Sequence, residues 1–296
     1  MVLEIIGGSS GPFLITLRES LEAALIIGII AAYLGKTGKG ELKKYLYVGT
    51  GAAILASIGI AGGLALLYGE LPEIGEQLFG GTASILATGI LTYMIFWMAK
   101  HAKEIKEHIQ KKIDLAVSKG YVAGIGILAF VAVFREGIET VLFLTALGVK
   151  DFSSTIIGAT IGIVLVIGLT FLVMKRIYSL NLQKLFKYSS ILLVIFAAGL
   201  FGSGVHEYIE ASQGAGVELG IVSASAYNIN PPEGNAFNEN GSVGGFFRGL
   251  VGYDGNPEWG RVIAYLGYWA VIGGFVYRTY GKAKKGDPSQ TSLVRT

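Results

Sequence analysis

The sequence predicts an all-α polytopic membrane protein with seven transmembrane helices, arranged as a 3+3 inverted repeat plus one additional helix. Its N-terminus is expected outside and its C-terminus in the cytoplasm. Three observations support this fold: a strongly apolar composition, seven apolar runs of spanning length, and basic residues that alternate between loops. Of the 296 residues, 52% are hydrophobic and only 15% are charged, and the mean hydropathy is +0.58. This composition is typical of membrane proteins.

Five of the apolar runs contain no Asp, Glu, Lys or Arg. They are residues 45–68, 78–99, 152–174, 188–205 and 262–277. Most are long enough to cross about 30 Å of hydrocarbon as a helix. Two further runs, residues 12–35 and 120–148, are each interrupted only by one charged cluster. The last run is short, but Arg261 and Arg278 at its ends can reach toward the interfaces. We therefore expect seven spans.

The charges of the connections predict the orientation, because Lys and Arg accumulate in short cytoplasmic loops. Basic residues follow the first, third, fifth and seventh runs. They are Lys36, Lys39, Lys43 and Lys44, then Lys100, Lys103, Lys106, Lys111, Lys112 and Lys119, then Lys175, Arg176, Lys184 and Lys187, and finally Lys282, Lys284 and Lys285. The connections after the second and sixth runs are acidic instead. Their acidic residues include Glu70, Glu73 and Glu76, and Glu207, Glu210, Glu218, Glu233 and Glu239.

An offset of 117 residues places LITLRESLEAAL on VAVFREGIETVL, which indicates an internal repeat. Because each copy would contain three spans, the second copy would enter the membrane in the opposite sense, and the two would meet near the midplane. We expect one transmembrane permease domain over residues 1–281. Its parts are repeat A at about 12–100, repeat B at about 120–207, an outer loop at 207–260 and a seventh helix at about 261–280, followed by a cytoplasmic tail at 282–296.

Charged residues inside two expected spans are the strongest functional signal. Both clusters have the pattern RExxE, at residues 18–22 and 135–139. An ionised side chain at the bilayer centre costs about 2.5 to 3.5 kcal/mol, and the three charges of each cluster share one helix face. Carboxylates without thiols or imidazoles suit hard cations. We interpret Glu19, Glu22, Glu136 and Glu139 as metal ligands, and Arg18 and Arg135 as their motif partners. The alternative is that each cluster is only an ion pair that orients two helices.

A third cluster, His206-Glu207-Tyr208-Ile209-Glu210, follows the sixth run. Glu207 and Glu210 are spaced to share a helix face, so His206, Glu207 and Glu210 form a candidate outer entry site for a metal. The alternative is a solvated helix end. The chain has no cysteine, which excludes disulfides and thiolate sites. Its net charge of +3 gives no reason to expect a nucleic-acid partner.

The paired RExxE motifs, on the first and fourth of seven spans, closely resemble those of the high-affinity iron permeases. This is the oxidase-dependent iron transporter family of fungi and bacteria, which includes iron/lead permease-like proteins. The similarity covers about residues 12–281 and includes the HEYIE segment. It implies a multi-pass plasma-membrane protein that imports iron through the two motifs and is not an enzyme. Iron, as Fe²⁺ or Fe³⁺, would be its substrate and not a prosthetic group. Membrane lipid, and a separate oxidase or extracytoplasmic iron-handling protein, would be its partners.

Other functions remain consistent with the same residues. The carboxylates would also serve a permease for another hard cation such as Mn, Ca or Pb, and seven helices would suit a metal sensor or receptor. A membrane di-iron oxidase is disfavoured, because such sites generally use Glu-x-x-His pairs that neither motif contains. The motifs do not distinguish Fe²⁺ from Fe³⁺, and they indicate neither the energy coupling nor the oligomeric state. Arg18 lies near the start of its run and Arg135 near the middle, so either the first helix begins earlier or the motifs are staggered.

Overall fold

The computed structural model describes residues 9–101, 110–111, 113–115, 122–148, 152–173 and 182–281. Regular structure within these ranges is helical, apart from one isolated bridge between Ser225 and Glu258. The expected all-α fold of a membrane protein is therefore confirmed. Much of the lysine-rich connection between residues 100 and 119, the basic pair Lys175 and Arg176, and the expected tail at 282–296 lie outside the described residues.

Each apolar run of the sequence corresponds to one long helix. These are α2 (Ser10–Lys36), α3 (Lys43–Tyr68), α4 (Glu73–His101), α6 (Val122–Gly148), α7 (Phe152–Val173), α8 (Leu182–Gly214) and α10 (Trp259–Gly281). Shorter helices are η1 (Gly40–Leu42), η3 (Gly220–Ser223) and α9 (Ser242–Val251). Among the described residues, four segments are long and apolar enough to cross a membrane by length and composition. They are Gly40–Tyr68, Glu73–Met98, Ser153–Thr170 and Ser189–Gly214.

Helix α8 is longer than the sequence suggested. The uncharged run ends at residue 205, but the helix continues to Gly214, so the HEYIE segment lies within it. The end of α8 is set by Gly216, which has a φ of 78° that favours glycine. There the backbone amide of Val217 donates to the carbonyl of Ser212 at 2.9 Å, a bond typical of helix C-termini.

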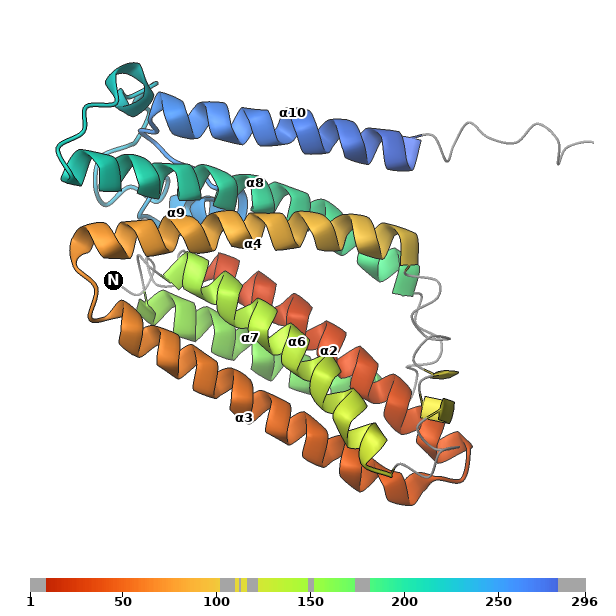
Figure 1. The fold of residues 1–296 in the computed structure, drawn as a ribbon. Helices are drawn as coiled ribbons and strands as arrows, with labels where there is room; N and C mark the ends of the chain where they lie inside the picture. The colour runs from red at the N-terminus through yellow and green to blue at the C-terminus, as the bar shows by residue number, and fades with distance from the viewer. Residues whose placement is uncertain are drawn as a thin grey trace, which may run out of the picture.

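The long helices lie side by side, with α4, α8 and α10 forming one part of the bundle and α2, α3, α6 and α7 the other (Figure 1). The most extensive helix contacts are α4 with α8, α3 with α6, and α2 with α7. The expected repeat matches α2, α3 and α4 with α6, α7 and α8. Under that match, the α2–α7 and α6–α3 contacts are equivalent, so each half packs its second helix against the first helix of the other half.

Glycines allow these two equivalent contacts to be close. Gly49 of α3 faces the backbone of Gly126 of α6, and Gly158 of α7 faces the backbone at the start of α2. A Cβ atom at Gly158 would lie 3.0 Å from the amide nitrogen of Phe13 and still closer to the carbonyl oxygen of Ser9. Small residues at such positions are the usual way for membrane helices to pack tightly. Because α2 packs against α7 and α6 packs against α3, both motif helices are held in the centre of this part of the bundle.

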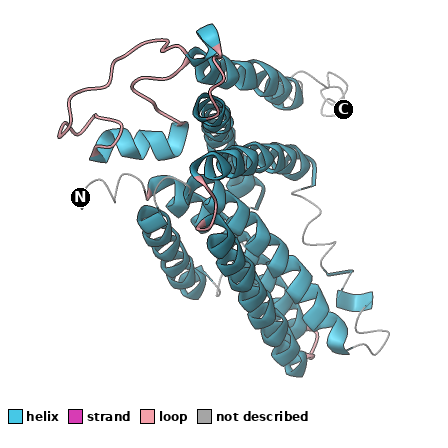
Figure 2. Ribbon diagram, turned by 60° about the vertical axis from the view of Figure 1, so that its left-hand side comes forward, coloured by secondary structure: helices cyan, strands magenta, loops and turns pink. Residues whose placement is uncertain are grey.

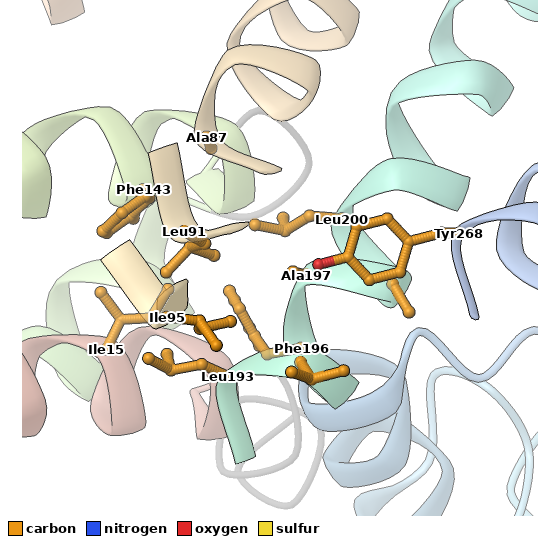
Figure 3. Packing of buried hydrophobic residues seen from close by; sticks show 12 residues of the cluster. Ile15, Ala87, Leu91, Ile95, Phe143, Leu193, Phe196, Ala197, Leu200 and Tyr268 are labelled. Atoms are coloured by element: carbon orange, nitrogen blue, oxygen red, sulfur yellow. The ribbon is translucent and has the colours of Figure 1, made fainter. Parts of the chain in front are cut away.

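Two apolar clusters lie along α2, one on each side of its charged motif. We call the first the Phe143 cluster (Figure 3): it comprises Ile15, Ala87, Leu91, Ile95, Phe143, Leu193, Val194, Phe196, Ala197, Ala198, Leu200 and Tyr268. The second, the Leu34 cluster, comprises Ile30, Ala31, Leu34, Leu46, Ile113, Ile125 and Ala129. The motif helices therefore pass from one apolar cluster, through the charged residues, to the other.

Residues 215–258 cover the end of the bundle where α2 begins (Figure 2). This segment contains η3 and α9, and it is held by backbone hydrogen bonds from Ala226 to Pro257 (2.8 Å) and from Ile229 to Gly255 (2.8 Å). Helix α9 packs against both α8 and α2. The outer loop expected between the sixth and seventh long helices is present, and it contains the short helices η3 and α9.

The close approach of α7 to α2 generates a stability prediction. We expect Gly158→Ala to lower the melting temperature of the detergent-solubilised protein by several degrees, because overpacking typically costs about 1 to 3 kcal/mol. The matched control is Gly168→Ala in the same helix, where no atom would lie within 4 Å of the new Cβ. Equal melting temperatures for the two variants, measured by a thermal shift assay, would contradict the predicted packing.

Candidate cation site

The glutamates of the two motifs are brought together where α2 and α6 are in contact. Glu19, Glu22 and Glu136 each offer a carboxylate oxygen within 4.8 Å of the others. Within the described part of the chain, this is the only group of three or more His, Asp or Glu side chains so close. All four motif glutamates are buried, and Glu19 is only 1% exposed. The two motifs thus lie at the same level and are not staggered along the helices.

The two arginines neutralise the glutamates unequally. Arg18 is buried and forms ion pairs with both glutamates of its own motif, and its Nη2 lies 2.6 Å from Glu22 Oε1 and 3.5 Å from the Met98 sulfur. The Arg135 side chain is 48% exposed, and its Nε donates to Glu139 Oε1 at 2.8 Å. Arg135 also lies over the ring of Trp97. Four carboxylates and two guanidinium groups leave a formal charge of minus two for a cation to balance.

Several carboxylate oxygens in the site are free to bind a ligand. Glu19 Oε2, Glu136 Oε2 and Glu139 Oε2 are buried and have no hydrogen-bond partner. Glu22 Oε1 has no well-directed hydrogen bond either, although it is close to Arg18. A buried acceptor without a partner costs about 1 to 3 kcal/mol. Bound hard cations take oxygen ligands of this kind, so a cation would offset a cost that the empty site carries.

Apolar side chains enclose the glutamates on both sides. Ile15 lies four residues before Glu19 on α2, and Phe143 lies four residues after Glu139 on α6, so each stands next to a glutamate on the same helix face. Both belong to the Phe143 cluster and are fully or almost fully buried. On the opposite side, Ile26 packs against the Leu34 cluster. The glutamates therefore lie in an enclosed region between two apolar layers.

A polar cavity of about 500 Å³ lies beyond the Phe143 cluster, at the end of the bundle covered by α9. Its polar lining includes Glu207, Glu239, Arg248 and Arg261. Leu200 belongs to both the cavity lining and the Phe143 cluster. The cluster therefore separates the cavity from the glutamates.

A second cavity, of about 260 Å³ and mainly apolar, reaches Arg18 and Glu22 between α2 and α8. Among the described residues, α2 and α8 make few direct contacts, whereas α6 packs against α4. Under the expected repeat, these two helix pairs are equivalent. The site is thus tightly enclosed on the α4–α6 side and loosely packed on the α2–α8 side.

The HEYIE segment is divided between two environments. Glu207 is buried and lines the polar cavity. His206 points elsewhere: its Nδ1 donates to the carboxylate of Glu258 at 3.0 Å, and its Nε2 lies 3.3 Å from Glu210. The three residues expected to form an entry site therefore do not converge on one point. Sequence reasoning missed Glu258, because it lies 52 residues from His206 and no motif links the two.

Residues 215–258 are anchored to the bundle by ion pairs. Arg261 of α10 pairs with Asp254 and donates to Ser203 Oγ at 3.4 Å. Burial acts to raise the pKa of Asp254, but the Arg261 charge, the hydrogen bond from the Asn256 backbone and the His206 charge together outweigh it, so this pKa is below its ordinary value of 3.8. In the same way, burial acts to raise the pKa of Glu258, but the hydrogen bond and charge of His206 hold it below 4.5. Both carboxylates are therefore stabilised in their ionised form.

Comparison with known proteins gives a consistent result. Residues 9–278 match the sequence model of the Iron permease FTR1 family. The ferrous iron permease EfeU of Yersinia pestis is 35% identical over 263 residues, which cover 87% of this chain and 89% of the relative. EfeU of Escherichia coli O6:K15:H31 is 36% identical over 203 residues, 68% of this chain and 74% of the relative. An uncharacterized protein of Archaeoglobus fulgidus is 39% identical over 272 residues, 92% and 96% of the two chains. No solved structure matches this chain.

The anchoring ion pairs predict a pH dependence. Because the pKa values of Asp254 and Glu258 are lowered in the folded state, they contribute stability above their ordinary values, and this contribution is lost as the pH falls through the lowered values. We expect the amide protection factors in residues 215–258, which compare the exchange rate with that of an unprotected amide at the same pH, to be high at neutral pH and to fall below about pH 4. Asp254→Asn should lower these protection factors already at neutral pH, whereas Glu233→Gln, an exposed residue of the same segment, should not. Protection factors that stay high at pH 3 would contradict this prediction.

Proposed function

Because the chain belongs to the iron permease FTR1 family, we propose that it imports iron across the plasma membrane through a site formed by its four motif glutamates. The observation that carries this proposal is the convergence of buried carboxylate oxygens without hydrogen-bond partners. The family consists of permeases, so the reaction is translocation and not catalysis. The relatives are named for ferrous iron, and a divalent ion would balance the formal charge of the site.

The polar cavity is the entry chamber in this proposal. The loop-charge pattern favours an orientation with the N-terminus, and with it the α9 end of the bundle, outside the cell. Iron then meets Glu207 and Glu239 in the cavity before it reaches the motif glutamates. His206 and Glu210 take a different role from the one expected: His206 lies between Glu210 and Glu258, and its bond to Glu258 holds the start of α10. A separate oxidase or extracytoplasmic iron-handling protein would deliver iron at this same end.

For a cation to bind at the motif glutamates, the guanidinium groups of Arg18 and Arg135 must move away from the carboxylates. Both glutamates of the first motif are paired with Arg18, so an arriving cation competes with its guanidinium. The apolar cavity next to Arg18 gives that side chain space to withdraw. Arg135 is half exposed and, among the described residues, forms an ion pair with Glu139 alone, so it can withdraw at less cost. In the absence of iron, the arginines lower the cost of keeping the carboxylates charged in an apolar bundle.

Release to the cytoplasm follows from the inverted repeat. The domain divides into repeat A (α2 to α4), repeat B (α6 to α8) and the additional α10, which gives seven spans with a cytoplasmic C-terminus. The described structure is open between α2 and α8 and closed between α4 and α6. Exchange of these two arrangements between the repeats would close the first pair and open the second, which is how inverted repeats alternate access around a fixed site.

Other hard cations prefer the same oxygen ligands, and a competition experiment with iron tests whether they are transported. The relatives do not favour Mn, Ca or Pb as the main substrate, and they give no support to a sensor or receptor. In liposomes containing the purified protein, iron should enter and the other metals should compete only in excess. Metal binding without any flux into the vesicles would favour the sensor.

Removal of single motif charges tests the site. We expect Glu19→Gln and Glu139→Gln each to lower the rate of radioactive iron uptake into liposomes at least tenfold, since loss of a metal-site group typically costs about 10- to 100-fold. Both substitutions keep the size of the side chain. Glu41→Gln, at an exposed residue of η1, is the control and should transport normally. Parental uptake by both motif variants would exclude the carboxylate mechanism.

The absence of cysteine in the chain allows a direct test of orientation. Ala224 lies in the α9-side segment and Thr37 follows α2 at the opposite end of the bundle, and both are exposed. A membrane-impermeant maleimide should label Ala224→Cys in intact cells, but Thr37→Cys only after permeabilisation. The reverse pattern would refute the proposed orientation. Labelling of both variants in intact cells would place both residues outside, and would refute an odd number of spans between residues 37 and 224.

A further inference from the structure

Thr16 of α2 carries a hydroxyl group without a hydrogen-bond partner. The residue is only 1% exposed, and its Oγ1 is fully buried. Threonines in helices commonly donate to the carbonyl four residues earlier, and several others in this protein do so. They are Thr50 (to Leu46, 2.9 Å), Thr88 (to Ser84, 2.8 Å), Thr140 (to Glu136, 2.7 Å) and Thr145 (to Val141, 2.8 Å). Thr16 therefore carries an unused polar group at a cost to the fold.

The position of Thr16 links this hydroxyl to the glutamates. It lies three residues before Glu19, about 60° away around the helix, and directly after Ile15 of the Phe143 cluster. Helix α7 comes close at this point because residue 162 is glycine: a Cβ there would lie 3.2 Å from Thr16 Cβ. Thr16 thus lies at the contact of α2 with α7, less than one helix turn before Glu19, whose Oε2 is also without a partner.

The two halves of the site differ at this position. The 117-residue offset matches Thr16 with Val133, which is also buried but has no polar atom. Because the second half is inverted, Thr16 lies on the α9 side of the glutamates and Val133 on the opposite side. Next to the motif, the α9 side of the site therefore offers a hydroxyl group within its apolar layer, whereas the opposite side offers only an aliphatic side chain.

We propose that the Thr16 hydroxyl is an additional oxygen ligand for the iron ion on its entry side, an inference that rests on the proposed function. A hydroxyl can donate its proton to a carboxylate while its lone pairs face a cation, and neutral oxygens commonly complete the shell of a hard cation. Thr16 replaces one hydration water as the ion leaves the apolar layer. The apolar counterpart Val133 offers no such ligand on the exit side, so the hydroxyl favours binding from the cavity.

The experiment compares three variants of the full chain, purified in detergent. Thr16→Val keeps the shape but removes the hydroxyl, Thr16→Ser keeps the hydroxyl, and Thr145→Val is the control, since its hydroxyl is bonded within the helix. Fe²⁺ affinity is measured by anaerobic titration calorimetry, and the melting temperature is measured without metal. We expect Thr16→Val to raise the Kd about five- to tenfold, the effect of one lost neutral contact. Thr16→Ser and Thr145→Val should stay within about twofold of the parent.

The metal-free melting temperature separates a ligand from a packing residue. Removing an unpartnered buried hydroxyl should raise it by about 1 to 3 °C in Thr16→Val, so the variant should be more stable but bind iron more weakly. A lower melting temperature, or an equal loss of affinity in Thr16→Ser, would overturn the proposal. An unchanged Kd in Thr16→Val would also overturn it, and if Glu19→Gln then loses binding, the proposed carboxylate site stands. Parental binding by Glu19→Gln would instead remove the proposed function itself.

Discussion

The burial of four carboxylates and two guanidinium groups inside an apolar bundle is the constraint on which the structure depends. Such charges are tolerated only if they pair, accept hydrogen bonds or bind an ion. Here the pairing is incomplete, because each motif glutamate keeps an oxygen without a directed hydrogen bond. The bundle therefore encloses negative charge that its own groups do not fully compensate. In the proposed function an iron ion would compensate it, and the two arginines lower the cost of the empty site.

The helix packing explains how a charged site can be both enclosed and able to open. Helices α2 and α6 carry the motifs, and each packs closely against α7 or α3 through glycine contacts, at Gly158 and at Gly49. These contacts do not involve the charged residues. The remaining sides of the motif helices face α4 and α8 and differ in tightness, with a cavity beside Arg18. If the tightly packed pairs α2–α7 and α3–α6 moved relative to α4 and α8, the site would be exposed without loss of the glycine contacts.

Much of the site was predictable because charge in an apolar helix is so rare that it needs no structural context to be noticed. The spacing of Arg18, Glu19 and Glu22 placed them on one face, and the matching motif suggested the second half. The HEYIE segment shows the limit of this reasoning. Helical spacing suggested that Glu207 and Glu210 share a site, but the residue just before the distant α10 decided otherwise: Glu258 binds His206, and Glu207 lines the cavity. Long-range partners leave no local pattern in the sequence.

The sequence by itself determined the helices, since hydrophobic runs and loop charges are local properties that act without knowledge of the fold. It also determined which side chains are the charged ones. Only the tertiary structure decided how those side chains are satisfied: Arg18 encloses two glutamates whereas Arg135 holds one, and the Thr16 hydroxyl is left without a partner. The physical reason is that hydrogen bonding and burial depend on which helices meet, and the small residues that allow α2 to approach α7, and α3 to approach α6, are ordinary glycines whose partners the sequence does not reveal.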